Sequence, residues 1–89
     1  MSDQNFAQFL RKYIVRSGES VFYFRAQSEV PSGQIYRYLS SASMPSSFML
    51  WRILEQIMRQ EGGSKQQRAM LLLEAHEAIR QSMIERGQR

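Results

Sequence analysis

The chain has 89 residues, enough for one helical core but too few for a second domain of ordinary size. Its net charge is +4, and ten of its twelve cationic side chains are Arg, whose planar fork suits phosphates and guanine edges, so a polyanionic partner is favoured. It has no Cys, one His, no recognisable secretory leader and no long apolar run, which excludes disulfides and thiolate metal sites and leads us to expect a cytoplasmic protein without metal or cofactor.

Five apolar residues at helical spacing predict the first helix, from about Asp3 or Asn5 to Arg16. They recur at i, i+3, i+4, i+7 and i+8 and would form one buried face. These residues are Phe6, Phe9, Leu10, Tyr13 and Ile14. Gly18 then suits the left-handed position that commonly follows the end of a helix.

The second expected helix is short and leads into a tight turn. Ser20 is a candidate N-cap for a helix over residues 21–28, with Phe24 as its core anchor. In the turn, Pro31 disfavours helical geometry at Val30, while its own fixed φ suits the opening of another helix. The pattern predicts two short helices joined by a turn.

The third expected helix covers residues 32–39 and presents a polar flank. Its inner face carries Ile35, Tyr38 and Leu39. Side chains on the opposite side would then point toward solvent or a ligand. They are Ser32, Gly33, Tyr36 and Arg37.

A serine-rich loop over residues 40–45 leads to a fourth helix, capped by Ser46 or Ser47 and ending near Gln60. One face of this helix carries Leu50, Ile53, Leu54 and Ile57. Four further apolar residues lie elsewhere around it, namely Phe48, Met49, Trp51 and Met58. A helix that is apolar nearly all round must be covered on more than one side.

A capping box over residues 64–67 predicts a fifth helix after the break at Gly62 and Gly63, running to about Arg86. One stripe of this helix carries Ala69, Leu72, His76, Ile79 and Met83. This is more apolar surface than one neighbouring helix would cover, so we expect a second copy or another protein to bind it. Alternatively, these residues only complete the core of a monomer.

The candidate dimer or partner surface therefore spans the fourth and fifth helices. It comprises Phe48, Trp51, Met58, Leu72, His76, Ile79 and Met83. We interpret His76 as a polar or interfacial helix residue, because a metal site or an acid–base pair needs further ligands or partners.

Apolar anchors and capping serines recur at fixed positions over the first two thirds of the chain. They are Ser20, Phe24, Val30, Ile35, the segment 39–46, Leu50, Ile53 and Ile57. With these residues the chain resembles, over roughly residues 6–57, the lambda repressor-like helix-turn-helix family, also called the xenobiotic-response-element type. Two residues depart from the family pattern. Arg25 stands where a small Ala packs between the two helices, and Glu29 stands where Gly makes the turn.

The resemblance implies an all-α, compact five-helix bundle with a helix-turn-helix and a long C-terminal helix. Residues 1–60 would form the DNA-binding core. Residues 61–89 would form a helix that completes the core, dimerises, or does both, within one domain overall. In the family, the third helix enters the major groove of a duplex.

Carried over by position, Ser32, Gly33, Tyr36 and Arg37 become the candidates for reading base edges. Arg37 would fork onto O6 and N7 of guanine, a contact worth ~1–3 kcal/mol of discrimination. Tyr36 would pack on a thymine methyl group or bond a phosphate. Gly33 would permit close approach of the backbone.

A second set of residues is expected to contact the sugar-phosphate backbone, which positions a duplex without reading it. The set comprises Ser20, Tyr23, Arg25, Gln34, Ser40, Ser41 and Ser43, with Arg11 and Lys12 adding charge. Other interpretations stay open: Ser20 as an N-cap alone, residues 40–43 as a solvated loop, and Arg25 in an ion pair with Glu29.

The leading hypothesis is a non-enzymatic, sequence-specific regulator of transcription that binds double-stranded DNA, most simply a dimeric repressor of the phage, plasmid or antitoxin kind. Two copies would place their third helices about one DNA turn apart. A toxin or the transcription machinery is a candidate protein companion. The alternative is a protein-interaction module that keeps the fold and binds through the fourth and fifth helices. An enzyme is not expected, because Glu74 and Glu77, three residues apart, are interpreted as solvated helix charge.

Overall fold

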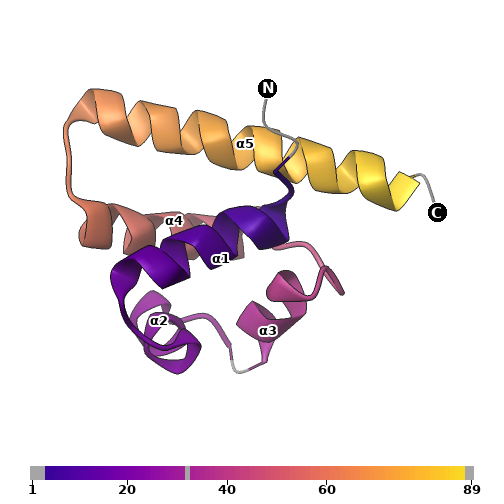
Figure 1. Ribbon diagram of the computed structural model, residues 1–89, viewed down its shortest axis with the longest axis horizontal. Coiled ribbons are helices and arrows are strands. Elements are labelled where there is room, and N and C mark those ends of the chain that lie inside the picture. Colours follow the sequence, from indigo (N-terminus) through magenta and orange to yellow (C-terminus); the bar gives the residue numbers. More distant parts are fainter. Residues whose placement is uncertain (1–3, 32, 88–89) are drawn as a thin grey trace.

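The computed structural model describes residues 4–31 and 33–87, which form five α-helices and no strand. The helices are α1 (Phe6–Ser17), α2 (Val21–Ser28), α3 (Gln34–Leu39), α4 (Ser47–Glu61) and α5 (Lys65–Gly87). The Cα radius of gyration is 12.5 Å. The expected all-α class and the five helices are thus confirmed for this part of the chain. Figure 1 shows α5 along one side of the molecule and α2 and α3 at the other, with α1 between them.

Local hydrogen bonds fix where α1 begins and ends. The Asn5 side chain accepts from the backbone N–H of Gln8 at 2.9 Å, and the Gln8 side chain accepts from the backbone N–H of Asn5, also at 2.9 Å, which forms a capping box. Gly18 is left-handed, with φ 73°, and ends the helix. The five apolar residues predicted to share one face are all buried.

The second and third helices follow the expected order, but α3 begins later than predicted. Ser20 caps α2 as expected, and the helix covers the predicted residues. The prediction that the third helix begins at Ser32 is wrong, because Gly33 has φ 87°, which is incompatible with a right-handed helix, and α3 starts at Gln34. Ser32 itself lies outside the described residues. The helices pack in pairs, α3 against α1 and α2 against α4.

Aromatic rings fill the centre of the molecule. Phe6, Phe9 and Phe24 are each no more than 1% exposed, and burial of one such side chain stabilises the fold by about 1.5–3 kcal/mol. The Phe6 ring stacks on Phe9 at 5.7 Å between centroids and meets the edge of Tyr38 at 6.2 Å. Val30 and Ile35, two further predicted anchors, are also buried.

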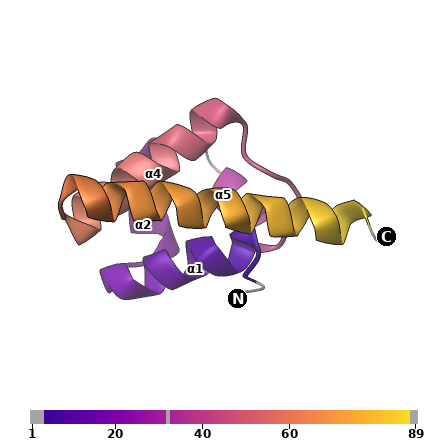
Figure 2. The same cartoon turned by 90° about the horizontal axis from the view of Figure 1, so that it is seen from above.

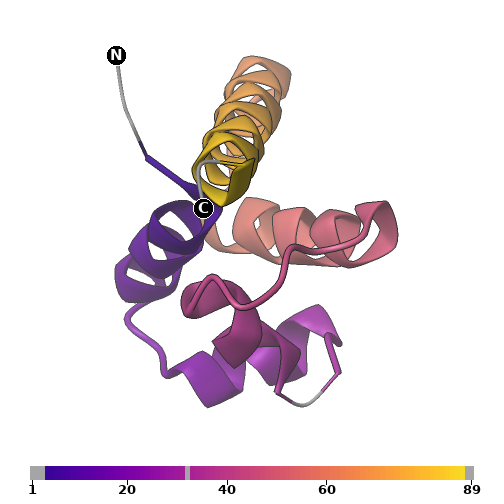
Figure 3. The same cartoon turned by 90° about the vertical axis from the view of Figure 1, so that its right-hand side faces the viewer.

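The inward face of α5 differs from the stripe that the sequence emphasised. Its buried residues are Leu71, Ala75, Ala78 and Ser82. Most of these side chains are small, so α5 lies close across α1 and α4, as Figures 2 and 3 show. Ser82 Oγ also accepts a hydrogen bond from the backbone N–H of Phe6 at 2.8 Å. The predicted capping box is present at the start of α5, between Ser64 and Gln67.

A polar cluster around Glu74 fastens α5 to α1. The carboxylate of Glu74 pairs with Lys12, accepts from the Tyr13 hydroxyl at 2.6 Å and accepts from Gln4 Nε2 at 3.0 Å. Burial acts to raise the pKa of Glu74, but the hydrogen bonds from Lys12, Tyr13 and Gln4 outweigh it and hold that pKa below its ordinary value. The interpretation of Glu74 as solvated charge is therefore wrong.

Removal of the Glu74 charge is expected to loosen the attachment of α5. We expect Glu74→Gln to lower the free energy of unfolding by about 1 kcal/mol at neutral pH, since the half-buried charge-assisted hydrogen bonds are weakened. Because folding lowers this pKa, the stabilisation is present above the ordinary pKa of 4.5 and is lost as the pH falls below it. The difference between wild type and variant should therefore shrink in acid. Urea unfolding followed by the helical circular dichroism signal measures both effects.

Glu77→Gln is the matched control, because Glu77 lies on the same helix and is exposed. It should change the free energy of unfolding by less than about 0.5 kcal/mol. Equal destabilisation by the two variants, or a difference that persists unchanged in acid, would contradict this role of Glu74.

Candidate nucleic-acid interface

The outward flank of α3 is open to solvent. Ile35 and Tyr38 face the core, where burial raises the pKa of Tyr38. Tyr36 is 54% exposed on the opposite side, and Arg37 beside it is also exposed. Apart from Gly33 and its two chain neighbours, no described atom lies within 4 Å of the position that a Cβ would take at Gly33. Figure 1 shows α5 on the far side of α1 from α3, which agrees with the exposure of these side chains.

Two guanidinium groups lie at the C-terminal half of α3. Arg37 has no carboxylate at ion-pair distance among the residues that the structure describes. Arg11 reaches over from α1, and its Nη2 donates to the carbonyl oxygen of Leu39 at 3.4 Å. Both side chains are exposed. This end of the molecule therefore presents positive charge that no described carboxylate neutralises.

Arg52 of α4 holds the turn between α2 and α3. Its Nη1 donates to the carbonyl oxygen of Glu29 at 2.6 Å and lies 3.8 Å from the Glu29 carboxylate. The Arg52 guanidinium also lies 4.6 Å from the ring centroid of Phe48, so the side chain is supported from both sides. Glu29 has φ 59°, the left-handed conformation that glycine adopts more easily. Glu29, which departs from the family pattern, thus has a strained backbone conformation that contacts from Arg52 of α4 stabilise.

Arg25 packs on an aromatic ring instead of pairing with Glu29. Its guanidinium lies 4.9 Å from the ring centroid of Phe22, and the Glu29 carboxylate faces Arg52. The proposed ion pair between Arg25 and Glu29 is not among the described contacts. Arg25 is half-buried, which leaves part of its charge available to a ligand.

The predicted backbone-contacting residues differ in what their side chains do. Ser20 Oγ accepts from the Tyr23 N–H at 3.1 Å, so this serine acts as an N-cap, and Tyr23 is 44% exposed. Gln34 is half-buried in the first turn of α3. Ser40 is exposed, and its hydroxyl donates to the Arg37 carbonyl at 3.1 Å.

Ser41 and Ser43 lie in the loop that follows α3. Ser41 has φ 62°, and Ala42 N–H then donates to the Arg37 carbonyl at 2.9 Å, which closes the helix. Ser43 was expected to touch a phosphate, but its Oγ is buried without a partner in the described structure. The loop thus turns the Ser43 hydroxyl inward, and a phosphate contact through it stays a prediction that this position does not support.

The candidate partner surface is only partly exposed. Phe48 and Trp51 are 60% and 53% exposed on α4. On α5, Leu72, His76 and Met83 are exposed. Met58 and Ile79, in contrast, are half-buried and pack against the core. These two residues partly complete the core of the monomer, which was the alternative interpretation.

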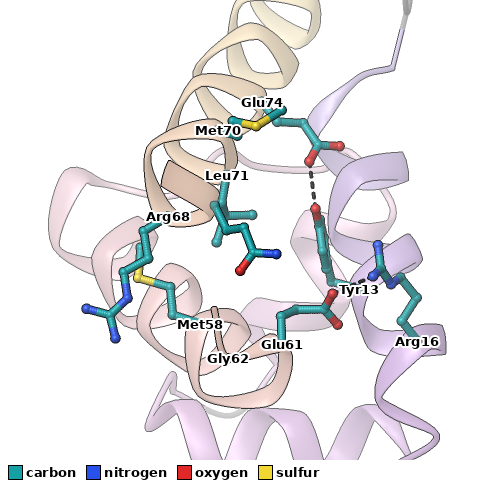
Figure 4. Close-up of a pocket in the computed structure, with 10 residues that line it drawn as sticks. Tyr13, Arg16, Met58, Glu61, Gly62, Arg68, Met70, Leu71 and Glu74 are labelled. Carbon is teal, nitrogen blue, oxygen red and sulfur yellow. Dashed lines mark hydrogen bonds and ion pairs between the residues drawn. The ribbon is translucent and has the colours of Figure 1, made fainter. Parts of the chain in front are cut away.

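A hollow of about 620 Å³ lies between α1, α4 and α5, away from α3 (Figure 4). Tyr13 donates to Glu74 along one wall, and Arg16 pairs with Glu61 at 2.5 Å along another. Burial and the adjacent Glu74 carboxylate raise the pKa of Tyr13 to about 12, so its hydroxyl keeps its proton. The carboxylates of Glu74 and Glu61 thus both have partners on α1, and these contacts join α5 and α4 to α1.

Comparison of the chain with protein-family models, curated proteins and solved structures gave no match. The family resemblance of the sequence therefore stays a prediction. The described residues contain no group of three or more His, Asp or Glu side chains placed to hold a metal ion. None of the described helices has the length and hydropathy to cross a membrane.

The strain at Glu29 can be measured with two substitutions that both remove its carboxylate. We expect Glu29→Gly to be more stable than Glu29→Ala by about 1 kcal/mol, since glycine adopts a left-handed conformation without steric cost. Chemical denaturation of the two variants gives this difference directly. Equal stability, or a more stable alanine variant, would mean that the residue is not held in the left-handed conformation.

Proposed function

We propose that the chain is a non-enzymatic DNA-binding regulator of transcription that uses α2 and α3 as a helix-turn-helix. The observation that carries the proposal is the exposed flank of α3, with Tyr36 and with Arg37, which forms no ion pair with the described carboxylates. The major groove of B-DNA is about 12 Å wide and admits an α-helix. A helix anchored by Ile35 and Tyr38 on its inner side fits that role, because these buried residues fix the direction in which its outer face points.

In this proposal, Arg37 donates to two acceptors on a guanine edge, and Tyr36 packs beside it on a thymine methyl group or bonds a phosphate. Arg11, Tyr23, Arg25 and Ser40 contact the flanking phosphates through side-chain groups that remain accessible. Arg52 contributes indirectly, since it holds the turn that orients α3. Binding would occlude a promoter, which makes a repressor the simplest regulator of this kind.

A second candidate function, recognition of a protein partner through α4, is favoured by Phe48 and Trp51. Both large aromatic side chains are more than half exposed, and Trp and Arg are frequent in the centres of protein interfaces. If Trp51→Ala lost binding to a protein partner while Arg37→Ala still bound that partner, protein recognition would be favoured over DNA recognition.

Selection of bound duplexes from a random pool, followed by affinity measurements on the selected sequence, tests the DNA proposal. We expect Arg37→Ala to weaken binding about 10- to 100-fold and to relax the preference at one base pair, because a bidentate guanine contact contributes ~1–3 kcal/mol. Tyr36→Ala should also weaken binding. The affinity of the wild type should fall steeply with salt as phosphate contacts release counterions.

Arg68→Ala is the matched control, because it removes one exposed positive charge from α5, which α1 separates from α3. We expect only a small loss of affinity, about threefold or less, at moderate salt. Absence of binding to any duplex at low salt would end the proposal. Equal losses in Arg37→Ala and Arg68→Ala would show that α3 does not read the duplex.

A further inference from the structure

A second hollow lies between the C-terminal half of α5 and the loop that joins α3 to α4. Its volume is about 490 Å³, and the residues that line it are Met44, Pro45, Ile79, Met83 and Arg86. Figure 1 shows this loop and the C-terminal half of α5 at the same end of the molecule. The volume falls within the range of about 300–1,000 Å³ that small-molecule sites have. The hollow is therefore large enough to receive a small ligand.

The wall of this loop–α5 hollow is mostly apolar. Met44 and Ile79 are half-buried and pack against the core, while Pro45 is half-buried on the side of the loop. Met83 is 64% exposed, so much of its side chain is in contact with water. Methionine side chains are flexible and polarizable, and they adapt to apolar groups of different shapes. The apolar part of a ligand would therefore find an adaptable surface here and would remove Met83 from water.

Arg86 is the charged residue in the lining of the loop–α5 hollow. Its side chain is exposed, and within residues 4–31 and 33–87 no carboxylate lies at ion-pair distance from it. The neighbouring carboxylate of Glu85 accepts instead from Asn5 Nδ2 at 2.9 Å and from Gln81 Nε2 at 3.2 Å. A guanidinium group can donate two parallel hydrogen bonds to a carboxylate or a phosphate. The charge of Arg86 therefore favours an anionic group in the ligand.

We propose that the loop–α5 hollow binds a small amphiphile with an apolar chain and one anionic head, of which a medium-chain fatty carboxylate is the simplest example. The chain packs against Met44, Ile79 and Met83, and the head accepts hydrogen bonds from Arg86. A cationic head would be repelled by that guanidinium. A standard protein interface involves about 20–30 residues on each side, whereas five residues line this hollow, so a small ligand fits it better than a protein does.

Hydration and the helix dipole limit the expected affinity. Each CH₂ group that leaves water completely strengthens binding by up to about fourfold, but the exposure of Met83 indicates that part of the chain stays hydrated. The negative end of the α5 dipole lies in the same turn as Arg86 and weakens the attraction for an anion. For decanoate we therefore expect a dissociation constant on the order of 0.1–1 mM. Binding needs no DNA, so its test stands or fails independently of the proposed function.

The methionine methyl resonances of the full chain report on the site directly, and single Met→Leu variants assign them. In an NMR titration with decanoate, we expect Met44 and Met83 to shift together and to saturate. Met58 and Met70 line the hollow of Figure 4 and should keep their positions. Saturating shifts of Met58 and Met70 alone would place the ligand in that other hollow and overturn the proposal. Absence of saturating shifts up to about 10 mM decanoate would also overturn it.

Decanoate, decanol and decylamine share one chain and differ in the charge of the head at neutral pH. We expect decanoate to bind about three- to fivefold more tightly than decanol, and decylamine to bind most weakly. Hexanoate should bind at least about tenfold more weakly than decanoate, because fewer CH₂ groups leave water. Equal affinities for the three heads, or tighter binding of the amine, would contradict the role of Arg86.

Vesicles of phosphatidylglycerol present an anionic head in a bilayer instead of on a free amphiphile. We expect decanoate below its micellar concentration to shift Met44 and Met83 without any vesicle. If vesicles shifted these resonances and free decanoate did not, the surface would bind a membrane, and the proposal of a small-ligand site would be overturned.

Two matched pairs of variants test the lining residues. Arg86→Gln and Arg80→Gln each remove one exposed positive charge from α5. We expect Arg86→Gln to weaken decanoate binding about three- to fivefold, and Arg80→Gln about twofold or less at moderate salt. Met83→Asp, followed through Met44, should weaken binding at least about tenfold, whereas Met70→Asp, at a residue that is also 64% exposed, should leave it unchanged. Equal effects within either pair would overturn the proposal, and circular dichroism checks that every variant retains its helices.

Discussion

Burial of the aromatic stripe on α1 is the interaction on which the rest of the molecule depends. Phe6 and Phe9 are almost fully enclosed, and Phe6 meets Tyr38 of α3 edge to face. The other side of the same helix receives α5, which accepts the Phe6 N–H through Ser82 and binds Lys12 and Tyr13 through Glu74. Without α1 in place, α3 and α5 would each lose the helix on which they pack most extensively.

This arrangement places α3 and α5 on opposite sides of α1. The exposed residues Tyr36 and Arg37 belong to α3, and the exposed residues Leu72, His76 and Met83 belong to α5. Because both helices pack on α1, a substitution in the buried face of α1 would disturb both of them.

The sequence predicted all five helices because each has regular apolar spacing or a clear cap, although α3 begins later than expected. The inner face of α5 was missed, since apolar residues surround that helix and periodicity cannot distinguish Leu71 from Leu72. The roles of Glu74 and Ser43 were also missed. Their surroundings come from α1 and from the fold of a loop, which local sequence patterns do not report.

The small side chains beneath α5 determine how the helix can vary. Ala75 and Ala78 are each 1% exposed, so a bulkier residue at either position has no space to enter and would lift the helix away from α1 and α4. Such a displacement would carry the outward-facing residues with it. The two alanines thus determine how far α5 lies from α1 and α4. Mutations at these buried positions would therefore shift the exposed residues of α5 without replacing any of them.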